Sequence, residues 1–89
     1  MKVADQLVEL ESVAEKKQIR VSYESIGGEL GAGGLCKVKG EHRVIVDKRA
    51  TDGEKVTVLA TALARFDLDD LFISEEVRAI IGRHAKKAG

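Results

Sequence analysis

The chain contains no proline, and its glycines gather in one short stretch. Five of the nine lie together in the sequence: Gly27, Gly28, Gly31, Gly33 and Gly34. A stretch with so few side chains offers little for a regular element to pack with, so we expect a loop from Glu24 to Gly34. The loop then divides the sequence into a front unit and a back unit of one domain, residues 1–89. At 89 residues, the chain can bury one thin core.

The front unit predicts a helix followed by a strand. Residues from Val3 to Lys17 carry apolar side chains at the spacing of one helix face. That stripe consists of Val3, Leu7, Leu10 and Ala14. The next residues alternate apolar and polar, which indicates a strand with one face toward the core. Its core-facing side chains are expected to be Ile19, Val21 and Tyr23.

The back unit begins with a predicted β-hairpin. Leu35–Lys39 and His42–Asp47 read as two antiparallel strands around a tight turn. Gly40 supplies the positive φ that such a turn requires. The run from Val44 to Val46 is apolar on both faces, so it is expected in the interior of the sheet.

Two helices are predicted to follow the hairpin. Thr51 and Glu54 have the spacing of a capping box, and the helix is expected to reach Arg65 or Phe66. Its apolar stripe is Val56, Leu59, Ala60 and Leu63. Ser74 is the predicted cap of the last helix, whose inner face would hold Val77, Ile80, Ile81 and His84. The sequence therefore predicts an α+β fold with a three-stranded sheet packed on three helices.

The charge balance limits the classes of partner. The chain has 15 basic and 15 acidic residues, whereas dedicated nucleic-acid and membrane-surface proteins carry a positive excess. The basic end of the last helix, Arg78, Arg83, Lys86 and Lys87, is thus a weak argument for nucleic-acid binding. No apolar run has the length of a membrane span, which favours a soluble, cytoplasmic protein. One cysteine excludes an internal disulfide.

Few residues suggest chemistry directly. Cys36 lies across the predicted hairpin from His42, which could act as its base. Asp67, Asp69 and Asp70 form the one carboxylate cluster, but they lack the ligand ladder of a calcium loop. The Gly27–Gly34 loop lacks the Gly-Lys-Ser/Thr ending of a phosphate-binding loop, so it reads as a connection or a partner contact.

Three segments carry a family resemblance. Gly34–Gly40 reads GLCKVKG, Val44–Arg49 reads VIVDKR, and Glu54–Arg65 reads EKVTVLATALAR. Together they resemble the core of the ImmA/IrrE-type metallopeptidases, which are small zincin-like domains with a leading helix, a few strands and an active-site helix. The resemblance is strongest over residues 34–65.

In that family, two histidines four residues apart on the active-site helix bind zinc, and a glutamate between them activates water. The matching positions here are Thr61, Ala62 and Arg65, none of which can serve that chemistry. The resemblance therefore implies a metal-free, zincin-like pseudoenzyme. Thr61 and Arg65 share a helix face with Val58, and the resemblance implies that this face looks toward an edge strand and a cleft.

These observations favour a non-catalytic protein-interaction or regulatory module without a cofactor. Its partner would be another protein, reached through an exposed strand edge, or a second copy in a homodimer, reached through a helix face that drives self-association. The alternative is a small enzyme whose site lies around Cys36 and His42 or in the Asp67–Asp70 cluster.

Overall fold

Residues 2–25 and 33–88 are described by the computed structural model, with side chains up to residue 84. Over these residues the chain forms a helix, three strands and two helices, which confirms the predicted α+β class. The elements are α1 (Val3–Lys16), β1 (Arg20–Glu24), β2 (Gly33–Val38), β3 (Glu41–Asp47), α2 (Asp52–Leu63) and α3 (Glu75–Ala88). No helix within this described part is long and apolar enough to cross a membrane.

The sheet has the strand order β1-β3-β2, so the apolar β3 lies in the centre as predicted. β2 and β3 form the predicted antiparallel hairpin, whose turn places Lys39 at φ 50° and Gly40 at φ 83°. β1 pairs with the other side of β3 and runs parallel to it. The sequence did not reveal this parallel pairing, because it joins strands that are distant along the chain.

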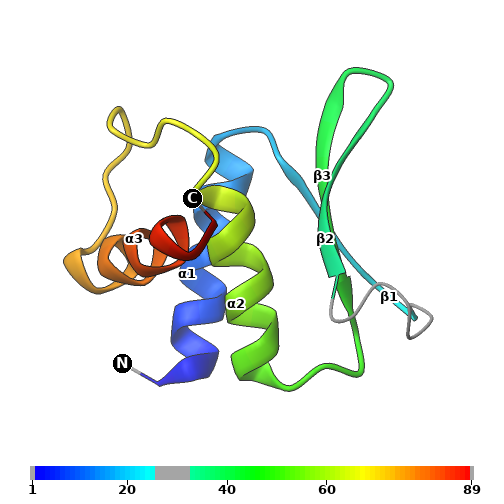
Figure 1. Ribbon diagram of the computed structural model, residues 1–89, viewed down its shortest axis with the longest axis horizontal. Helices are drawn as coiled ribbons and strands as arrows, with labels where there is room; N and C mark the ends of the chain where they lie inside the picture. Colours follow the sequence, from blue (N-terminus) through cyan, green and yellow to red (C-terminus); the bar gives the residue numbers. More distant parts are fainter. Residues whose placement is uncertain (1, 26–32, 89) are drawn as a thin grey trace.

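The helices cover one face of the sheet (Figure 1). α1 and α2 lie side by side, with α1 against β1 and α2 against β2 and β3. α3 packs on this helix pair, on the side away from the sheet. No element of the described ranges covers the opposite face of the sheet.

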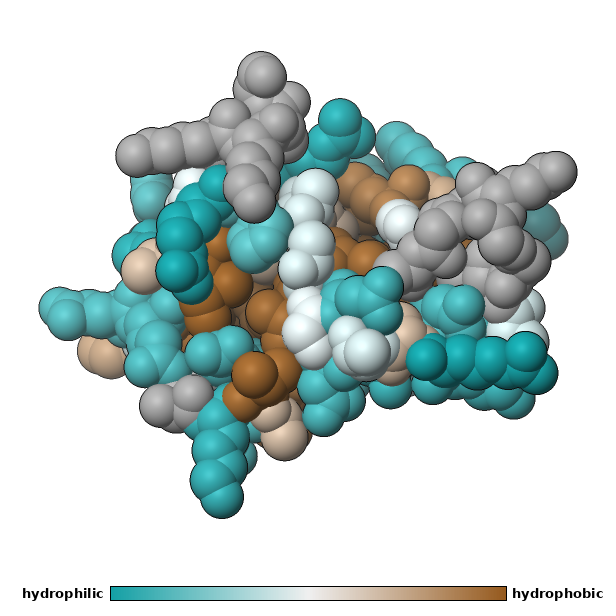
Figure 2. All heavy atoms as spheres, turned by 60° about the horizontal axis from the view of Figure 1, so that its bottom comes forward, coloured by the Kyte–Doolittle hydropathy of each residue, from teal (hydrophilic) through white to brown (hydrophobic). Residues whose placement is uncertain are grey.

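The core fills the space between the sheet and the helices and continues between α2 and α3. All four residues of the predicted α2 stripe are buried, and so are Val77, Ile80 and Ile81 of α3. Val44 and Val46 of β3 are fully buried beneath α2. Figure 2 shows apolar side chains in brown reaching the surface between polar ones, as expected where one thin core serves so short a chain.

Two predicted core positions are wrong. Val3 is 43% exposed because it begins α1, whose buried residues start further along at Leu10. Tyr23 lies on the helix-facing side of the sheet, as alternation predicts, but it is 38% exposed. It sits near the end of the edge strand β1, and its hydroxyl reaches Glu11 of α1 at the rim of the core.

Both predicted helix caps are present. The Thr51 hydroxyl accepts from the Glu54 amide at 3.2 Å, and the Glu54 carboxylate accepts from the Thr51 amide at 3.0 Å. The Ser74 hydroxyl accepts from the Val77 amide at 3.3 Å at the start of α3. α2 ends at Leu63, two residues before the earliest predicted end, because the Arg65 amide turns back to the Ala62 carbonyl at 3.2 Å.

The predicted loop from Glu24 to Gly34 is too long at both ends. Glu24 completes β1, and Gly33 and Gly34 begin β2. Gly33 has φ +129°, and a Cβ built on it would lie 1.9 Å from the Ile45 carbonyl oxygen. This glycine therefore allows the backbone of β2 to approach β3 closely. Residues 26–32 of the predicted loop lie outside the described residues.

Candidate functional site

A cleft of about 330 Å³ lies between α2 and the edge strand β2. Val58, Thr61 and Arg65, the three residues singled out in the sequence, all line it. The remaining lining residues are Gly33, Gly34, Leu35, Thr57 and Ala62. The structure therefore brings the candidate residues together in one hollow, where the strand edge forms the opposite wall.

Local sequence explains why these side chains face β2. The Thr51–Glu54 capping box fixes where α2 begins, and Val56, Leu59 and Leu63 bury the opposite side of the helix in the core. Residues 58, 61 and 65 follow one another by three or four positions, so they share the remaining side. Arg65 lies just beyond the end of α2 and is exposed, while Val58 and Thr61 are half-buried.

The chemistry of this cleft is limited. Among the residues that the structure describes, no histidine, cysteine or carboxylate lines it, so these lining residues offer neither a metal ligand nor a general base. Beyond the cleft, the side chains that the structure describes contain no group of three or more potential metal ligands. The Thr57 hydroxyl donates to the Gly53 carbonyl at 3.1 Å, so Thr61 and Arg65 are the described lining side chains whose donors remain for a ligand.

The strand edge is the other functional element of the cleft. β2 pairs with β3 along one side, and its other side is an edge of the sheet. Leu35 faces the helices, packs against the core and gives the cleft an apolar floor.

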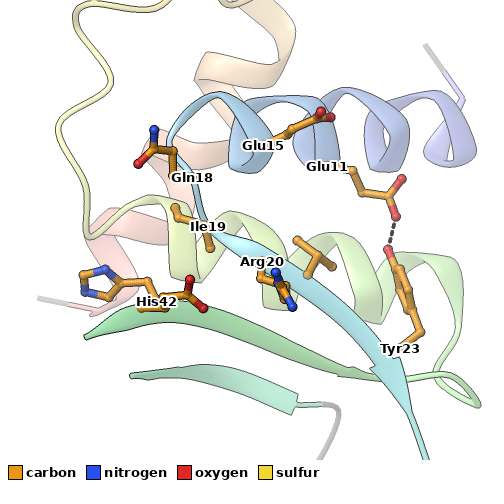
Figure 3. A pocket seen from close by; sticks show the side chains of 9 residues that line it. Glu11, Glu15, Gln18, Ile19, Arg20, Tyr23 and His42 are labelled. Carbon is orange, nitrogen blue, oxygen red and sulfur yellow. Dashed lines mark hydrogen bonds between the residues drawn. The ribbon is translucent and has the colours of Figure 1, made fainter. Parts of the chain in front are cut away.

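A second hollow was not anticipated from the sequence. It has a volume of about 590 Å³ and lies between α1 and the edge strand β1 (Figure 3). The figure shows Tyr23 of β1 and Glu11 of α1 pointing toward each other, with Glu15 one turn further along the helix. Glu11 and Glu15 are four residues apart, but that spacing alone reads as an ordinary solvated helix face.

Tyr23 is the most perturbed titratable group of this hollow. Burial raises the pKa of its phenol, and the hydrogen bond to Glu11 and the negative charges of Glu11 and Asp52 raise it further. The Lys55 ammonium lies 5.5 Å from the centre of the Tyr23 ring. At neutral pH the phenol is therefore a hydrogen-bond donor held by α1 and not a nucleophile.

The proposed cysteine site is contradicted by the sheet geometry. Cys36 pairs with Arg43, and Lys37 pairs with His42. Side chains alternate along a strand, so His42 shares the helix-facing side with Val44 whereas Cys36 lies on the opposite face. The His42 ring stacks edge-on against Phe66, with 4.9 Å between the ring centroids. His42 therefore cannot act as the base for Cys36.

The acidic turn is used for internal contacts. The Asp67 carboxylate accepts from the Asp69 amide at 3.0 Å, and Asp70 pairs with Lys17 at the end of α1 at 3.3 Å. Asp69 lies 3.8 Å from Arg78 of α3. This arrangement fits the interpretation of an exposed turn between helices, with no set of carboxylates converging on one point.

Among the basic residues of the last helix, Arg78 also makes contacts within the chain. Arg78 contacts Asp69 and donates to the Leu71 carbonyl at 3.4 Å. His84 is half-buried, as predicted for the inner face of α3, and its Nδ1 lies 2.8 Å from the Ile80 carbonyl oxygen. The side chains of Lys86 and Lys87 lie outside the described residues.

No protein-family model, curated protein or solved structure matches this chain. The fold itself defines an α+β domain with a mixed three-stranded sheet, one face of which is covered by helices.

Proposed function

We propose that this protein is a non-catalytic interaction module that binds an extended segment of a partner protein along the edge of β2. The segment would lie in the cleft beside α2 and continue the sheet by main-chain hydrogen bonds, a mode of peptide recognition known as β-augmentation. On this proposal the domain is zincin-like but metal-free, in keeping with the resemblance of residues 34–65.

The single observation that carries the proposal is the content of the cleft. Over the described residues it combines a strand edge, an apolar floor from Leu35 and Val58, and the side chains of threonine and arginine, which are neither metal ligands nor proton-transfer groups. Such a lining suits binding and offers nothing for hydrolysis. The position of Thr61 and Arg65 opposite an edge strand is also what the resemblance implies, which supports the proposal.

Arg65 suggests the chemistry of the bound segment. Its guanidinium has no carboxylate within 4 Å among the described residues, so a partner can use all of its donors. A planar guanidinium binds a carboxylate with two parallel hydrogen bonds. The preferred segment is therefore apolar where it crosses Leu35 and Val58, and acidic where it reaches Arg65.

Selection from a random peptide library displayed on phage tests the proposal. We expect the wild-type protein to enrich peptides with alternating apolar residues and an acidic residue, and Arg65→Glu to lose them. Amide chemical shifts should move in β2 and α2 when a selected peptide is added. Charge reversal at Lys39, which lies in the hairpin turn outside the cleft, is the matched control.

Two results would contradict this function. Selected peptides that bind Arg65→Glu as well as the wild type, or that shift amides elsewhere, would place recognition outside the cleft. Stoichiometric zinc in the purified protein would mean that the metal-free assignment of Thr61 and Arg65 is wrong.

A further inference from the structure

The face of the sheet that points away from the helices carries an ordered pattern of charge. Side chains on this face follow from the alternation that turns the half-buried Val21 and the buried Val44 and Val46 toward the helices. They are Arg20, Ser22 and Glu24 of β1, Glu41, Arg43, Ile45 and Asp47 of β3, and Gly34, Cys36 and Val38 of β2. We call these ten residues the open face, since no element of the described ranges packs on it (Figure 1).

Like charges stand side by side on the open face. Arg20 is in register with Arg43, and Glu24 is in register with Asp47. Neighbouring strands are roughly 4.8 Å apart, so each of these pairs brings equal charges close together, which is unfavourable within one chain. Over the described residues neither arginine has a carboxylate within 4 Å, and the Arg43 Nε is buried without a hydrogen-bond partner.

The two charged rows are placed symmetrically about a neutral row. Ser22 is in register with Ile45, and Ile45 is paired with Gly34. On β1 the arginine precedes this row by two residues and the glutamate follows it by two. On β3 the arginine and the aspartate have the same spacing. Each charged row therefore lies about 7 Å from the neutral row, on opposite sides of it.

We propose that the open face binds a second copy of this chain in a twofold-symmetric dimer. The two sheets pack face to face with their strands running in opposite directions and with the axis along the Ser22–Ile45 row. Arg20 then faces the partner's Glu24, Arg43 faces the partner's Asp47, and Ile45 faces the partner's Ile45. Every like-charge pair of the single chain gains opposite charges across the interface.

The charges also select this arrangement over the other twofold packing of the same face. An axis parallel to the strands would place Arg43 against the partner's Arg43 and Asp47 against the partner's Asp47, which adds repulsion.

The face is three strands wide, on the order of 300 Å² in footprint, which is below the standard interface size. We therefore expect weak, salt-sensitive association, with a dissociation constant of about 10 µM or higher.

Reciprocal charge reversal on β1 tests the proposal by sedimentation equilibrium. Arg20→Glu puts two glutamates opposite each other across the dimer, and Glu24→Arg does the same with two arginines. Each variant alone should associate at least about tenfold more weakly than the wild type. An equimolar mixture should recover the affinity, because the Arg20→Glu chain then faces arginines at both positions. Both residues are exposed, so folding is retained.

Lys37→Glu is the control, since it reverses a charge on the same sheet but on the helix-facing side. A wild-type chain that remains monomeric up to about 1 mM at low salt overturns the proposal. The proposal also fails if Arg20→Glu associates like the wild type, or if the mixture associates no better than its components.

Dilution of labelled wild-type protein, which needs no variant, should shift amides of residues 20–24 and 43–47. Shifts confined to the helices would overturn it. None of these measurements depends on the peptide cleft.

Discussion

The Ser74 hydroxyl donates a hydrogen bond of 2.8 Å to Oε2 of Glu9, a residue 65 positions earlier in the chain. The same hydroxyl accepts a hydrogen bond from the Val77 amide at the start of α3. One side chain therefore caps α3 and also fastens it to α1. Since α1 lies on the sheet, this contact links the outermost helix to the layer that forms the core.

Replacing Ser74 should remove both contacts at once. We expect Ser74→Ala to lower the free energy of unfolding by about 1–2 kcal/mol, the usual effect of losing a helix cap together with a charged hydrogen bond. Urea unfolding followed by circular dichroism measures it. Ser12→Ala on the exposed side of α1 is the control and should change stability by less than about 0.5 kcal/mol. Equal effects of the two substitutions would show that the cap contributes nothing special.

The two described glycines at the start of β2 should respond very differently to alanine. A Cβ on Gly33 would collide with the Ile45 carbonyl, and the backbone has a φ that side chains rarely adopt. Gly34 has open space around the same position. Gly33→Ala should therefore cost at least about 3 kcal/mol, whereas Gly34→Ala should be close to neutral. Thermal unfolding of the two variants compares them directly, and similar melting temperatures would contradict the close approach of β2 to β3.

Local signals in the sequence were sufficient for the helices and the hairpin. Three local features depend on residues only a few positions apart: the Thr51–Glu54 capping box, the Ser74 cap and the turn at Gly40. Their sequence patterns therefore predict the contacts directly. The apolar β3 likewise indicated a central strand. Pairing between β1 and β3 could not be predicted in the same way, because nothing near either strand encodes its distant parallel neighbour.

The candidate site was predictable in part for the same reason. Helical spacing predicts Val58, Thr61 and Arg65 on one face, the family resemblance implies an edge strand opposite it, and the structure shows that this strand is β2. Alternation placed Tyr23 on the correct side of the sheet, but it could not show how deeply the ring is buried. The hairpin alone predicts that Cys36 and His42 are neighbours. Whether the two side chains lie on the same face of the sheet depends on the register of the hairpin, which the sequence does not determine.

The separation of Cys36 and His42 leads to a kinetic prediction. His42→Ala should leave the alkylation rate of Cys36 by iodoacetamide at pH 7 within about twofold of the wild-type rate, because the sheet lies between the two side chains. Stopped-time alkylation followed by mass spectrometry gives both rates. A decrease of about tenfold in the variant would mean that the imidazole does reach the thiol, and would restore the cysteine enzyme as a candidate.

Tyr23 should resist ionisation as long as the protein is folded. The chain has one tyrosine and no tryptophan, so phenolate absorbance near 295 nm reports this residue alone. A free tyrosine is half ionised at about pH 10. Because burial and the contact with Glu11 raise the pKa of Tyr23, the folded protein should show little phenolate at that pH. Phenolate that rises as in a denatured control would contradict the contact between Tyr23 of β1 and Glu11 of α1.

The same shift predicts how stability changes at alkaline pH. A phenol whose pKa is raised by folding holds its proton more tightly in the folded chain, so its contribution to stability is complete below about pH 10 and is lost as the pH rises further. Glu11→Gln removes the negative charge but keeps an acceptor for the hydroxyl. In this variant the pKa of Tyr23 should fall toward the free value without reaching it, because burial is the largest cause and remains. The alkaline loss of stability should therefore be smaller than in the wild type. If the free energy of unfolding falls with rising pH in the same way in both proteins, the alkaline loss of stability comes from groups other than Tyr23.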